Sequence, residues 1–350
     1  TNCPVTICKR IRWKGGRQRA EPASFLSYPT VNFERCALLM KTKDFMKTII
    51  LLVVLTFISL IFPFFSAFIY LIWPIPIVFY IVKYGTGEAV PLVALVAVVN
   101  GLLVGLVYDI PNGIIMGVYS ILSFGLIGFF LGSGIREKFN PFWTMVLTIV
   151  AVIISNLAMA LSLPYILGFN YQALVTEMRA YLDAAGLFPQ YDIILEQFLY
   201  LLKTLVPSLL LVTSAIHGIL IYYISTWYLR RKGFDLHQYK PFSTWRFPRW
   251  WISLALVLLI VARTYLQYSS PGGLSEQARV VIINLMILLF FLIFLQGFAV
   301  VVNWLGRRTS NFLLVLVIFA LFFFNIFVIY VLIFLGFIDM WFNLRRNQKA

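Results

Sequence analysis

The sequence predicts an all-α fold, a polytopic transmembrane helical bundle of eight or nine spans. Three observations predict this class. Of the 350 residues, 61% are hydrophobic and only 12% are charged, whereas a soluble domain is about half apolar and about a quarter charged. The apolar residues form long runs, and ~20 in succession cross a bilayer as one helix. The runs lack the alternation of a membrane β-barrel, and backbone groups in lipid must pair within their own segment.

Residues 1–47 are basic and show no apolar period, so we predict a disordered N-terminal extension. All the cysteines of the chain lie in it, namely Cys3, Cys8 and Cys36. Their odd number and spacing fit neither a disulfide framework nor a zinc site, so we expect free thiols, no metal and no other cofactor. Met40 and Met46 stand just before the first apolar run, and we expect native translation to start at one of them.

The next part of the chain, 48–228, contains six apolar spans. They lie at about 48–63, 64–82, 89–108, 112–134, 141–166 and 203–228. Prolines at 63, 74 and 76 interrupt the first two, so one long span followed by a re-entrant segment is an alternative to two crossings.

An acidic segment, 167–202, separates the fifth span from the sixth. Apolar residues recur at helical spacing from Leu174 to Ala185, which indicates an amphipathic helix on the outer surface. Such a helix acts either as a lid over an outward-facing pocket or as a surface helix on lipid headgroups.

A basic loop at 229–249 precedes a C-terminal region, 250–350, with further apolar spans and a basic tail. The spans lie at about 250–268, 277–304 and 311–340. Because Lys and Arg accumulate on the cytoplasmic side, the N-terminus and the basic loop are expected inside and the acidic segment outside, in the cell membrane. Nine spans place the basic tail outside, and eight crossings place it inside; charge alone leaves both open.

Polar side chains at membrane depth are the candidate ligand-binding residues, because such groups are costly in lipid and face a cavity or a partner. The candidates are Asn100, Asp109, Asn156 and His217. His217 is the sharpest of them, since it lies mid-span one turn after Ser214. For each amide or imidazole the alternative is a hydrogen bond between helices.

Two other patterns concern packing and anchoring. Glycines four residues apart let helix backbones approach closely in lipid; they are Gly101, Gly105, Gly113, Gly117, Gly128 and Gly132. Trp and Arg side chains around the basic loop suit the lipid headgroup region; they are Trp245, Arg246, Arg249 and Trp250. A docking site for a cytoplasmic protein is the alternative reading of the loop.

Enzyme motifs are missing from the sequence: it has no Gly-x-Ser-x-Gly, no His-Glu-x-x-His and no P-loop. We therefore expect no catalytic residues and no enzymatic activity. The net charge of +15 comes from residues that flank the spans, with no basic, aromatic-interleaved module, so we expect no nucleic-acid partner. Any use of ATP has to come from a partner.

Several of these residues form a pattern that resembles a known family. The pattern is Asn100-Gly101-x3-Gly105-x3-Asp109 with the later glycines, then Phe242-x2-Trp245-x2-Pro248-x-Trp250, and finally Leu335-Gly336-x2-Asp339 before Arg345-Arg346. Over about 45–350 the chain resembles the YybS family of uncharacterised bacterial membrane proteins. That family is similar to the substrate-binding subunits of energy-coupling-factor transporters and to the cell-shape protein MreD. The resemblance implies a six-helix core at about 48–228 with both ends inside, followed by about three C-terminal helices.

Two functional hypotheses follow. The first is small-solute binding or transport of the substrate-binding-subunit type, for which the resemblance implies ATPase and membrane partner subunits. The second is a scaffold in cell-envelope or cell-shape assembly, similar to MreD, with loop 229–249 docking envelope-assembly proteins. One difference from the transporter subunits argues against the transport hypothesis. The vitamin-binding subunits carry small residues four apart on their first helix, whereas Thr48–Phe62 contains neither Gly nor Ala. The sequence names no substrate.

Overall fold

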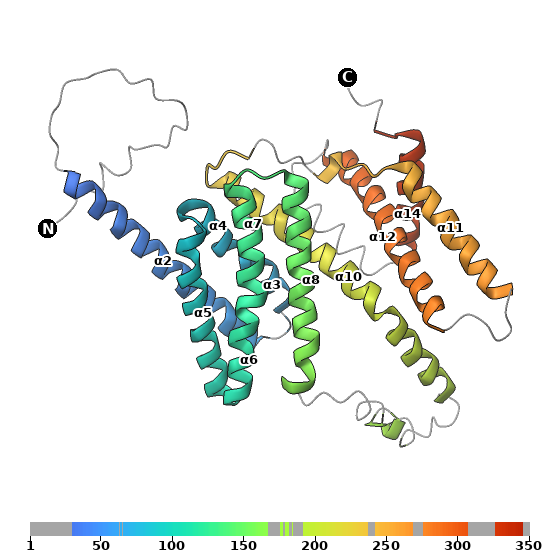
Figure 1. The fold of residues 1–350 in the computed structure, drawn as a ribbon, viewed down its shortest axis with the longest axis horizontal. Helices are drawn as coiled ribbons and strands as arrows, with labels where there is room; N and C mark the ends of the chain where they lie inside the picture. The colour runs from blue at the N-terminus through green and yellow to red at the C-terminus, as the bar shows by residue number, and fades with distance from the viewer. Residues whose placement is uncertain are drawn as a thin grey trace. The chain divides into compact units, whose positions relative to one another are not determined.

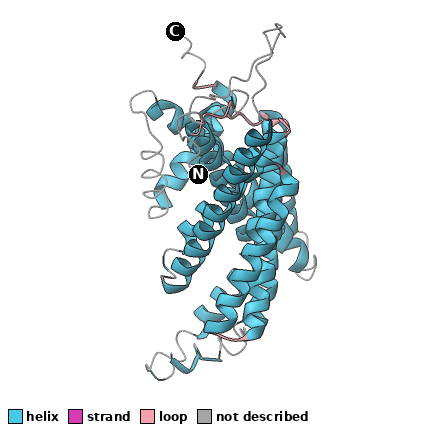
Figure 2. Ribbon diagram, turned by 90° about the vertical axis from the view of Figure 1, so that its left-hand side faces the viewer, coloured by secondary structure: helices cyan, strands magenta, loops and turns pink. Residues whose placement is uncertain are grey.

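The computed structural model describes residues 30–62, 64, 66–166, 176–177, 179–181, 184, 192–236, 242–268, 276–306 and 326–345. The regular elements in these ranges are all helical, and no strand occurs among them (Figure 1, Figure 2). The predicted all-α class is confirmed. By its internal contacts the chain divides into two units, Thr1–Lys43 and Asp44–Ala350, and the second contains every candidate site residue.

Six helices in the described ranges are long and apolar enough to cross a membrane. They are Lys41–Ile61, Thr86–Val107, Ile110–Arg136, Pro141–Leu161, Thr204–Arg231 and Gln277–Trp304. Two further apolar helices, Phe68–Tyr84 and Phe327–Phe342, are shorter. A multi-span bundle is therefore confirmed, whereas the predicted number of eight or nine crossings is not.

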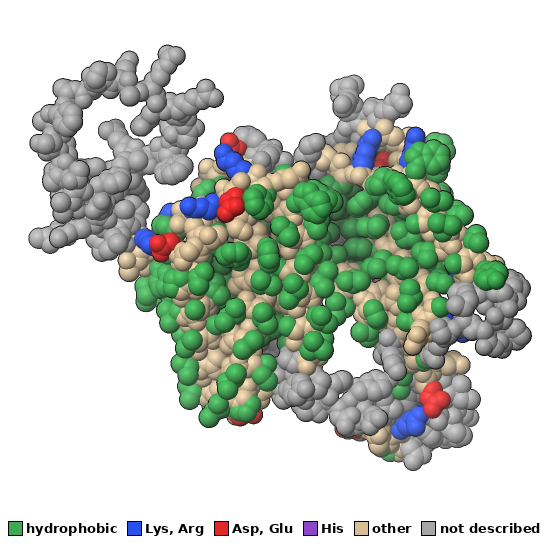
Figure 3. Space-filling model, in the orientation of Figure 1, with side chains coloured by type: hydrophobic (Ala, Val, Ile, Leu, Met, Phe, Trp, Pro, Cys, Tyr) green, Lys and Arg blue, Asp and Glu red, His purple; other side chains and the backbone are tan. Residues whose placement is uncertain are grey.

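The flanks of these helices are apolar on the outside (Figure 3). Leu106 is 84% exposed and Ile110 is 74% exposed, which suits a surface that faces lipid. Lys and Arg side chains gather in the upper part of the same view, above the ends of the helices.

Helix α2 (Thr30–Ile61) begins well before the predicted first span. No Gly or Pro interrupts this stretch, and Pro63 follows it, so the helix has nothing to stop it earlier. The prediction of disorder was therefore wrong for residues 30–47, and residues 1–29 lie outside the described ranges. Within the second unit, Asp44 accepts hydrogen bonds from Lys83 Nζ at 2.5 Å and Tyr84 Oη at 2.7 Å.

The predicted second span, 64–82, is built from two short helices. Helix α3 (Ser66–Ile72) and helix α4 (Pro74–Tyr84) are separated by a single turn residue, Trp73. The indole Nε1 of Trp73 donates to Thr56 Oγ1 at 3.1 Å, so the break is fastened to α2.

Helix α5 (Thr86–Val107) and helix α6 (Ile110–Ser120) form a close antiparallel hairpin. A Cβ placed on Gly113 would lie 2.5 Å from the carbonyl oxygen of Gly101, so only glycine permits this approach of the two backbones. Two further glycines of the hairpin, Gly105 and Gly117, also face the opposite helix.

A π-helical turn, η2 (Ile121–Gly125), connects α6 to helix α7 (Leu126–Arg136). Helix α7 packs on α4, because Gly128 and Gly132 leave room there for isoleucine side chains. Gly128 and Gly132, the last two glycines predicted to act in helix packing, therefore form the contact between α7 and α4.

Helix α8 (Pro141–Ile166) is followed, after the acidic segment, by the long helix α10 (Asp192–Arg231). Residues 192–202 were predicted to belong to a separate outer segment, but they form the first turns of α10. Arg179 forms an exposed ion pair of 2.8 Å with Glu196 on α10. Half of the segment predicted as an amphipathic helix, residues 174–175, 178, 182–183 and 185, lies outside the described residues.

The C-terminal region contributes helix α11 (Arg249–Tyr268), helix α12 (Glu276–Gly306) and helix α14 (Ile326–Phe342). Helices α12 and α14 meet backbone to backbone at Gly297 and Gly336. A short 3₁₀ turn, η3 (Phe242–Thr244), lies in the loop before α11.

Candidate intramembrane binding site

The imidazole of His217 is held by a backbone carbonyl that a proline leaves free. Pro74 begins α4 and has no amide hydrogen, so the carbonyl of Tyr70, four residues earlier, lacks its usual helical donor. His217 on α10 makes a hydrogen bond with the backbone of Tyr70. Because a carbonyl can only accept, the imidazole donates this bond.

This hydrogen bond fixes which nitrogen of the neutral ring carries hydrogen. Nε2 of His217 is buried and has no partner among the described residues. The donor to Tyr70 is therefore Nδ1–H, which leaves a lone pair on Nε2. The site thus contains a buried acceptor that no described protein group satisfies.

A second polar contact joins α10 to α8 one turn before His217. Asn156 Nδ2 donates to Ser214 Oγ at 2.8 Å, and Ser214 lies fully buried one turn before His217. The residue before Asn156, Ser155, is hydrogen-bonded through its side chain to Tyr119. Helix α8 therefore presents two neighbouring polar residues, one to α10 and one to α6.

We call this group the intramembrane cluster. Its members are Tyr70, Tyr119, Ser123, Ser155, Asn156, Ser214 and His217. Two of the segments that supply it are irregular: α3 ends at the break before α4, and η2 is a π-turn, a feature frequent at functional sites. An aromatic layer adjoins the cluster, because Phe124 stacks on Tyr70 at 5.6 Å and on Trp73 at 3.8 Å.

The cluster is uncharged. Its members carry hydroxyl, amide and imidazole groups only, and the nearest charged residue in sequence to any of them is Asp109, about three helical turns before Tyr119. No Lys, Arg, Asp or Glu occurs in α3, in α8 or between Thr204 and Leu229 of α10.

The other two predicted ligand residues bond to residues outside this cluster. Asn100 is fully buried on α5 and donates from Nδ2 to Ser120 Oγ at 3.2 Å. Asp109 is exposed at the tip of the α5–α6 hairpin, where its carboxylate accepts from the backbone and side-chain nitrogens of Asn112 at 2.7 and 3.0 Å. Such a carboxylate caps a helix N-terminus, so we do not retain Asp109 as a ligand contact.

Sequence reasoning selected Asn156 and His217 but missed Tyr70, Tyr119 and Ser155. Hydroxyl groups are frequent in membrane spans and often bond to their own helix, so position alone did not distinguish these. The usable signal was Pro74, because a proline inside an apolar run frees the carbonyl four residues before it.

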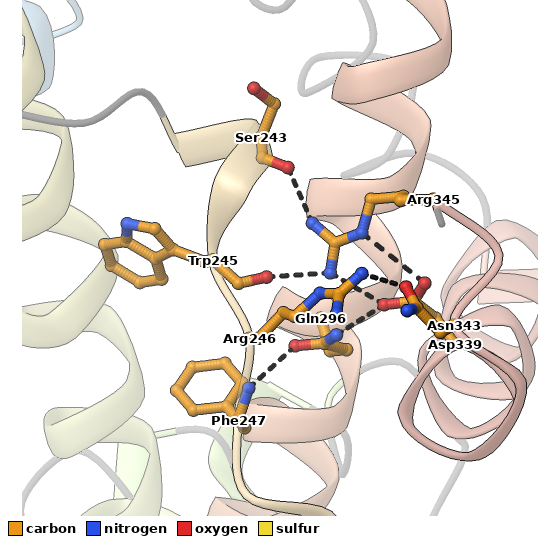
Figure 4. A network of polar contacts seen from close by, with 8 residues as sticks. All are labelled: Ser243, Trp245, Arg246, Phe247, Gln296, Asp339, Asn343 and Arg345. Atoms are coloured by element: carbon orange, nitrogen blue, oxygen red, sulfur yellow. Dashed lines mark hydrogen bonds and ion pairs between the residues drawn. The ribbon is translucent and has the colours of Figure 1, made fainter. Parts of the chain in front are cut away.

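A second polar network joins the loop before α11 to the C-terminal end of the chain (Figure 4). Arg345 and Asp339 form an ion pair of 2.6 Å, with side chains 5% and 0% exposed. The Arg345 guanidinium also donates to the carbonyls of Ser243 at 2.6 Å and Trp245 at 2.7 Å. The buried charge is therefore both paired and hydrogen-bonded.

Gln296 on α12 completes this network. Its Nε2 donates to Asp339 Oδ2 at 2.5 Å, and its Oε1 accepts from the backbone nitrogen of Phe247 at 3.1 Å (Figure 4). Arg246 adds a hydrogen bond to the side chain of Asn343. We call the network the loop clamp and interpret it as structural; its members are Ser243, Trp245, Phe247, Gln296, Asp339 and Arg345.

The four residues predicted as interfacial differ in their surroundings. The ring of Trp245 packs against Phe242 at 4.9 Å and belongs to the interior of the loop. Trp250 is 65% exposed, and the Arg249 guanidinium lies 5.6 Å from its ring. Arg249 and Trp250 therefore fit the predicted headgroup contact better than Trp245 does.

Comparison with known proteins places the chain in a family. The model of a family described as predicted membrane protein (DUF2232) matches residues 50–340, which include the intramembrane cluster and the loop clamp as far as Asp339. No curated protein and no solved structure matches the chain. With six described helices that are long and apolar enough to cross a membrane, the chain is a multi-pass membrane protein and belongs to the DUF2232 family.

Proposed function

We propose that this protein binds a small solute inside the membrane and takes part in its transport. The observation that carries the proposal is the buried, unpartnered Nε2 of His217 within the intramembrane cluster. A buried polar atom without a partner costs roughly 1–3 kcal/mol, and polar groups of this kind within spans are commonly functional. A bound solute supplies the missing hydrogen bond.

The irregular helices support binding over simple packing. Discontinuous helices in transporters line sites near the bilayer midplane, where unpaired backbone groups contact the substrate. Here the interrupted pair α3–α4 and the π-turn η2 both contribute to the cluster. Asn156, Ser214 and His217 are the residues that we assign to solute contact.

We further propose eight crossings in a bacterial cell membrane, with both termini in the cytoplasm. The basic ends of α7 and α10 mark the cytoplasmic side. Arg345 contacts the carbonyls of Ser243 and Trp245, so the end of α14 shares the side of the loop that follows α10. An even number of crossings satisfies both conditions, and of the two numbers that charge left open, eight and nine, only eight is even.

The energy source in this proposal is a partner. The chain has no nucleotide-binding motif, and the YybS family that it resembles is similar to substrate-binding subunits that assemble with ATPases and a second membrane subunit. Affinity purification in mild detergent is expected to recover such subunits.

A thermal-stability screen of the purified protein against a library of small solutes tests the binding step. A solute that binds only the folded state raises the melting temperature. Alanine at Asn156, Ser214 or His217 is expected to raise at least tenfold the solute concentration that is needed for the same rise in melting temperature. Ser225→Ala is the matched control, because Ser225 is also fully buried on α10 but outside the cluster. Unchanged affinity in all three cluster variants contradicts the site.

A membrane scaffold in envelope assembly is the second candidate, and one observation favours it. Trp250 and Trp251 are 65% and 74% exposed beside Arg249, at the loop predicted to be cytoplasmic. Deleting the loop is a poor test, because it removes the carbonyls that bind Arg345. The double variant Trp251→Ala, Arg249→Ala leaves the loop clamp in place; loss of envelope-protein recovery with intact solute binding would support the scaffold.

A further inference from the structure

We infer that the solute of the intramembrane cluster is uncharged and donates an N–H or O–H hydrogen bond to Nε2 of His217. The inference rests on the proposed binding function and adds the chemical class of the solute. Two independent features of the cluster carry it: the direction of the hydrogen bond from His217 to Tyr70, and the lack of charge around it.

The first feature sets the donor. The carbonyl of Tyr70 has only lone pairs to offer, so His217 must use its hydrogen there. Nε2 then presents a lone pair in a buried position with no described partner. A solute that offers another acceptor, such as an ether or carbonyl oxygen, leaves this atom unsatisfied.

The second feature sets the charge. A buried ion needs an opposite charge, because desolvation costs several kcal/mol even after the protein relaxes. The helices that form the cluster carry no acid or base near it: the closest charged residues on α10 are Lys203 and Arg230, more than two turns from His217 on either side. Neither a cationic nor an anionic solute finds a counter-ion within two turns of the cluster on these helices.

The neighbouring groups fit a neutral polar solute. Tyr119, Ser123 and Ser155 are hydroxyl residues that donate or accept, and Asn156, the residue after Ser155 on α8, does both. Discrimination follows from hydrogen bonding, since a site that satisfies a solute donor rejects the analogue without it by a large factor.

Nitrogen-15 NMR of histidine tests the inference, because the chain has only two histidines. His237→Ala leaves His217 as the single labelled ring in lipid nanodiscs. The probes share one ring: phenol is a neutral donor, anisole lacks the donor, and benzoate and benzylammonium are charged. We expect an unprotonated Nε2 without probe, an upfield displacement of its resonance with phenol, and none with the other three.

Three results overturn the inference. They are an Nε2–H tautomer in the protein without probe, a response to anisole equal to that to phenol, and no response to phenol when Nε2 is unprotonated. Ser225→Ala serves as a control that keeps the phenol response, and Asn156→Ala is expected to reduce it. An Nε2–H tautomer leaves the proposed function standing, whereas a solute library without any binder contradicts the function itself.

Discussion

The backbone carbonyl of Tyr70 accepts its hydrogen bond from the side chain of His217 on another helix, and not from its own helix. The cause is local, because Pro74 occupies the position whose amide would have paired with it. One proline therefore both separates α3 from α4 and creates the acceptor that orients the imidazole. The ring can present Nε2 to a solute only in this orientation.

Pro74→Ala is expected to weaken the hydrogen bond of His217 although it leaves the His217 side chain itself unchanged. The new amide at position 74 competes for the carbonyl of Tyr70, so Nδ1–H of His217 loses part of its hydrogen bond. Nitrogen-15 NMR should then show a mixture of tautomers and a weaker response to phenol. Pro76→Ala is the matched control, since it restores a donor for Ile72 instead; equal effects of the two variants would contradict the role assigned to Pro74.

Asn284 on α12 is expected to be coupled energetically to Pro207 on α10. Its Oδ1 accepts from Ser208 N and its Nδ2 donates to Thr204 O, both at 2.8 Å. These two groups would pair with each other in an uninterrupted helix, and a proline beside them favours a side chain inserted between them.

A double-mutant cycle measures this coupling. Asn284→Ala should cost roughly 1–3 kcal/mol of unfolding free energy, because it leaves two buried backbone groups unpaired. In a Pro207→Ala background, α10 can close its own bond, and the cost should fall. The measurement is denaturation in mild detergent. Equal costs of Asn284→Ala in the two backgrounds would contradict an energetic coupling between Asn284 and Pro207.

Gly297→Ala and Gly336→Ala are expected to separate α12 from α14. A Cβ at Gly297 overlaps the carbonyl oxygen of Leu332, and one at Gly336 overlaps that of Ile293. Overpacking of this kind costs about 1–3 kcal/mol or more. Gly87→Ala, where a Cβ meets nothing within 4 Å, is the control and should be neutral or stabilising. A glycine variant at the helix contact that unfolds at the wild-type temperature would refute the close approach.

Arg345→Ala is expected to destabilise the protein strongly, by about 3–5 kcal/mol, because it leaves the carboxylate of Asp339 buried without its partner. Replacing both members with apolar residues of similar size, Arg345→Met and Asp339→Leu together, should cost less than the single change. Arg246→Ala, at an exposed arginine, should have a small effect. If the double variant were less stable than Arg345→Ala, the unpaired carboxylate of Asp339 could not be the cause of the destabilisation in Arg345→Ala.

The proposed topology is tested with single cysteines in a background where the three native cysteines are serine. Glu137→Cys and Lys349→Cys should react with a membrane-impermeant reagent from the same side. Tyr108→Cys, at the exposed tip of the α5–α6 hairpin, should react from the opposite side. Labelling of positions 108 and 349 from one side would contradict eight crossings.

Much of the fold could be read from the sequence because lipid imposes simple rules. Apolar runs must become helices, and glycines four apart allow backbones to touch, as Gly101 and Gly113 do. No such spacing predicted the contact of Gly297 with Gly336, because each of the two helices contributes only one glycine to that contact. Residues 30–47 were misread since their polar composition hid a stretch free of helix breakers.

The candidate site was only partly predictable for a similar reason. Asn156 and His217 stood out as polar groups at depth, but the same rule also selected Asp109, which is a helix cap. Tyr70 and Tyr119 resembled ordinary interfacial or packing residues. Gln296, Asp339 and Arg345 lie far apart in the chain, and nothing local to any of them indicates that they form one buried network.

By itself, the sequence determined that this chain is a bundle of membrane helices, which helices are glycine-packed, and that its spans are almost free of charge, because each of these properties depends on composition and spacing along one segment. Only the tertiary structure decided which polar groups meet. The bond of His217 to Tyr70, the insertion of Asn284 beside Pro207 and the pairing of Arg345 with Asp339 each depend on how one element packs on another. Hydrogen bonds act over about 3 Å, a distance that local spacing cannot specify between separate helices.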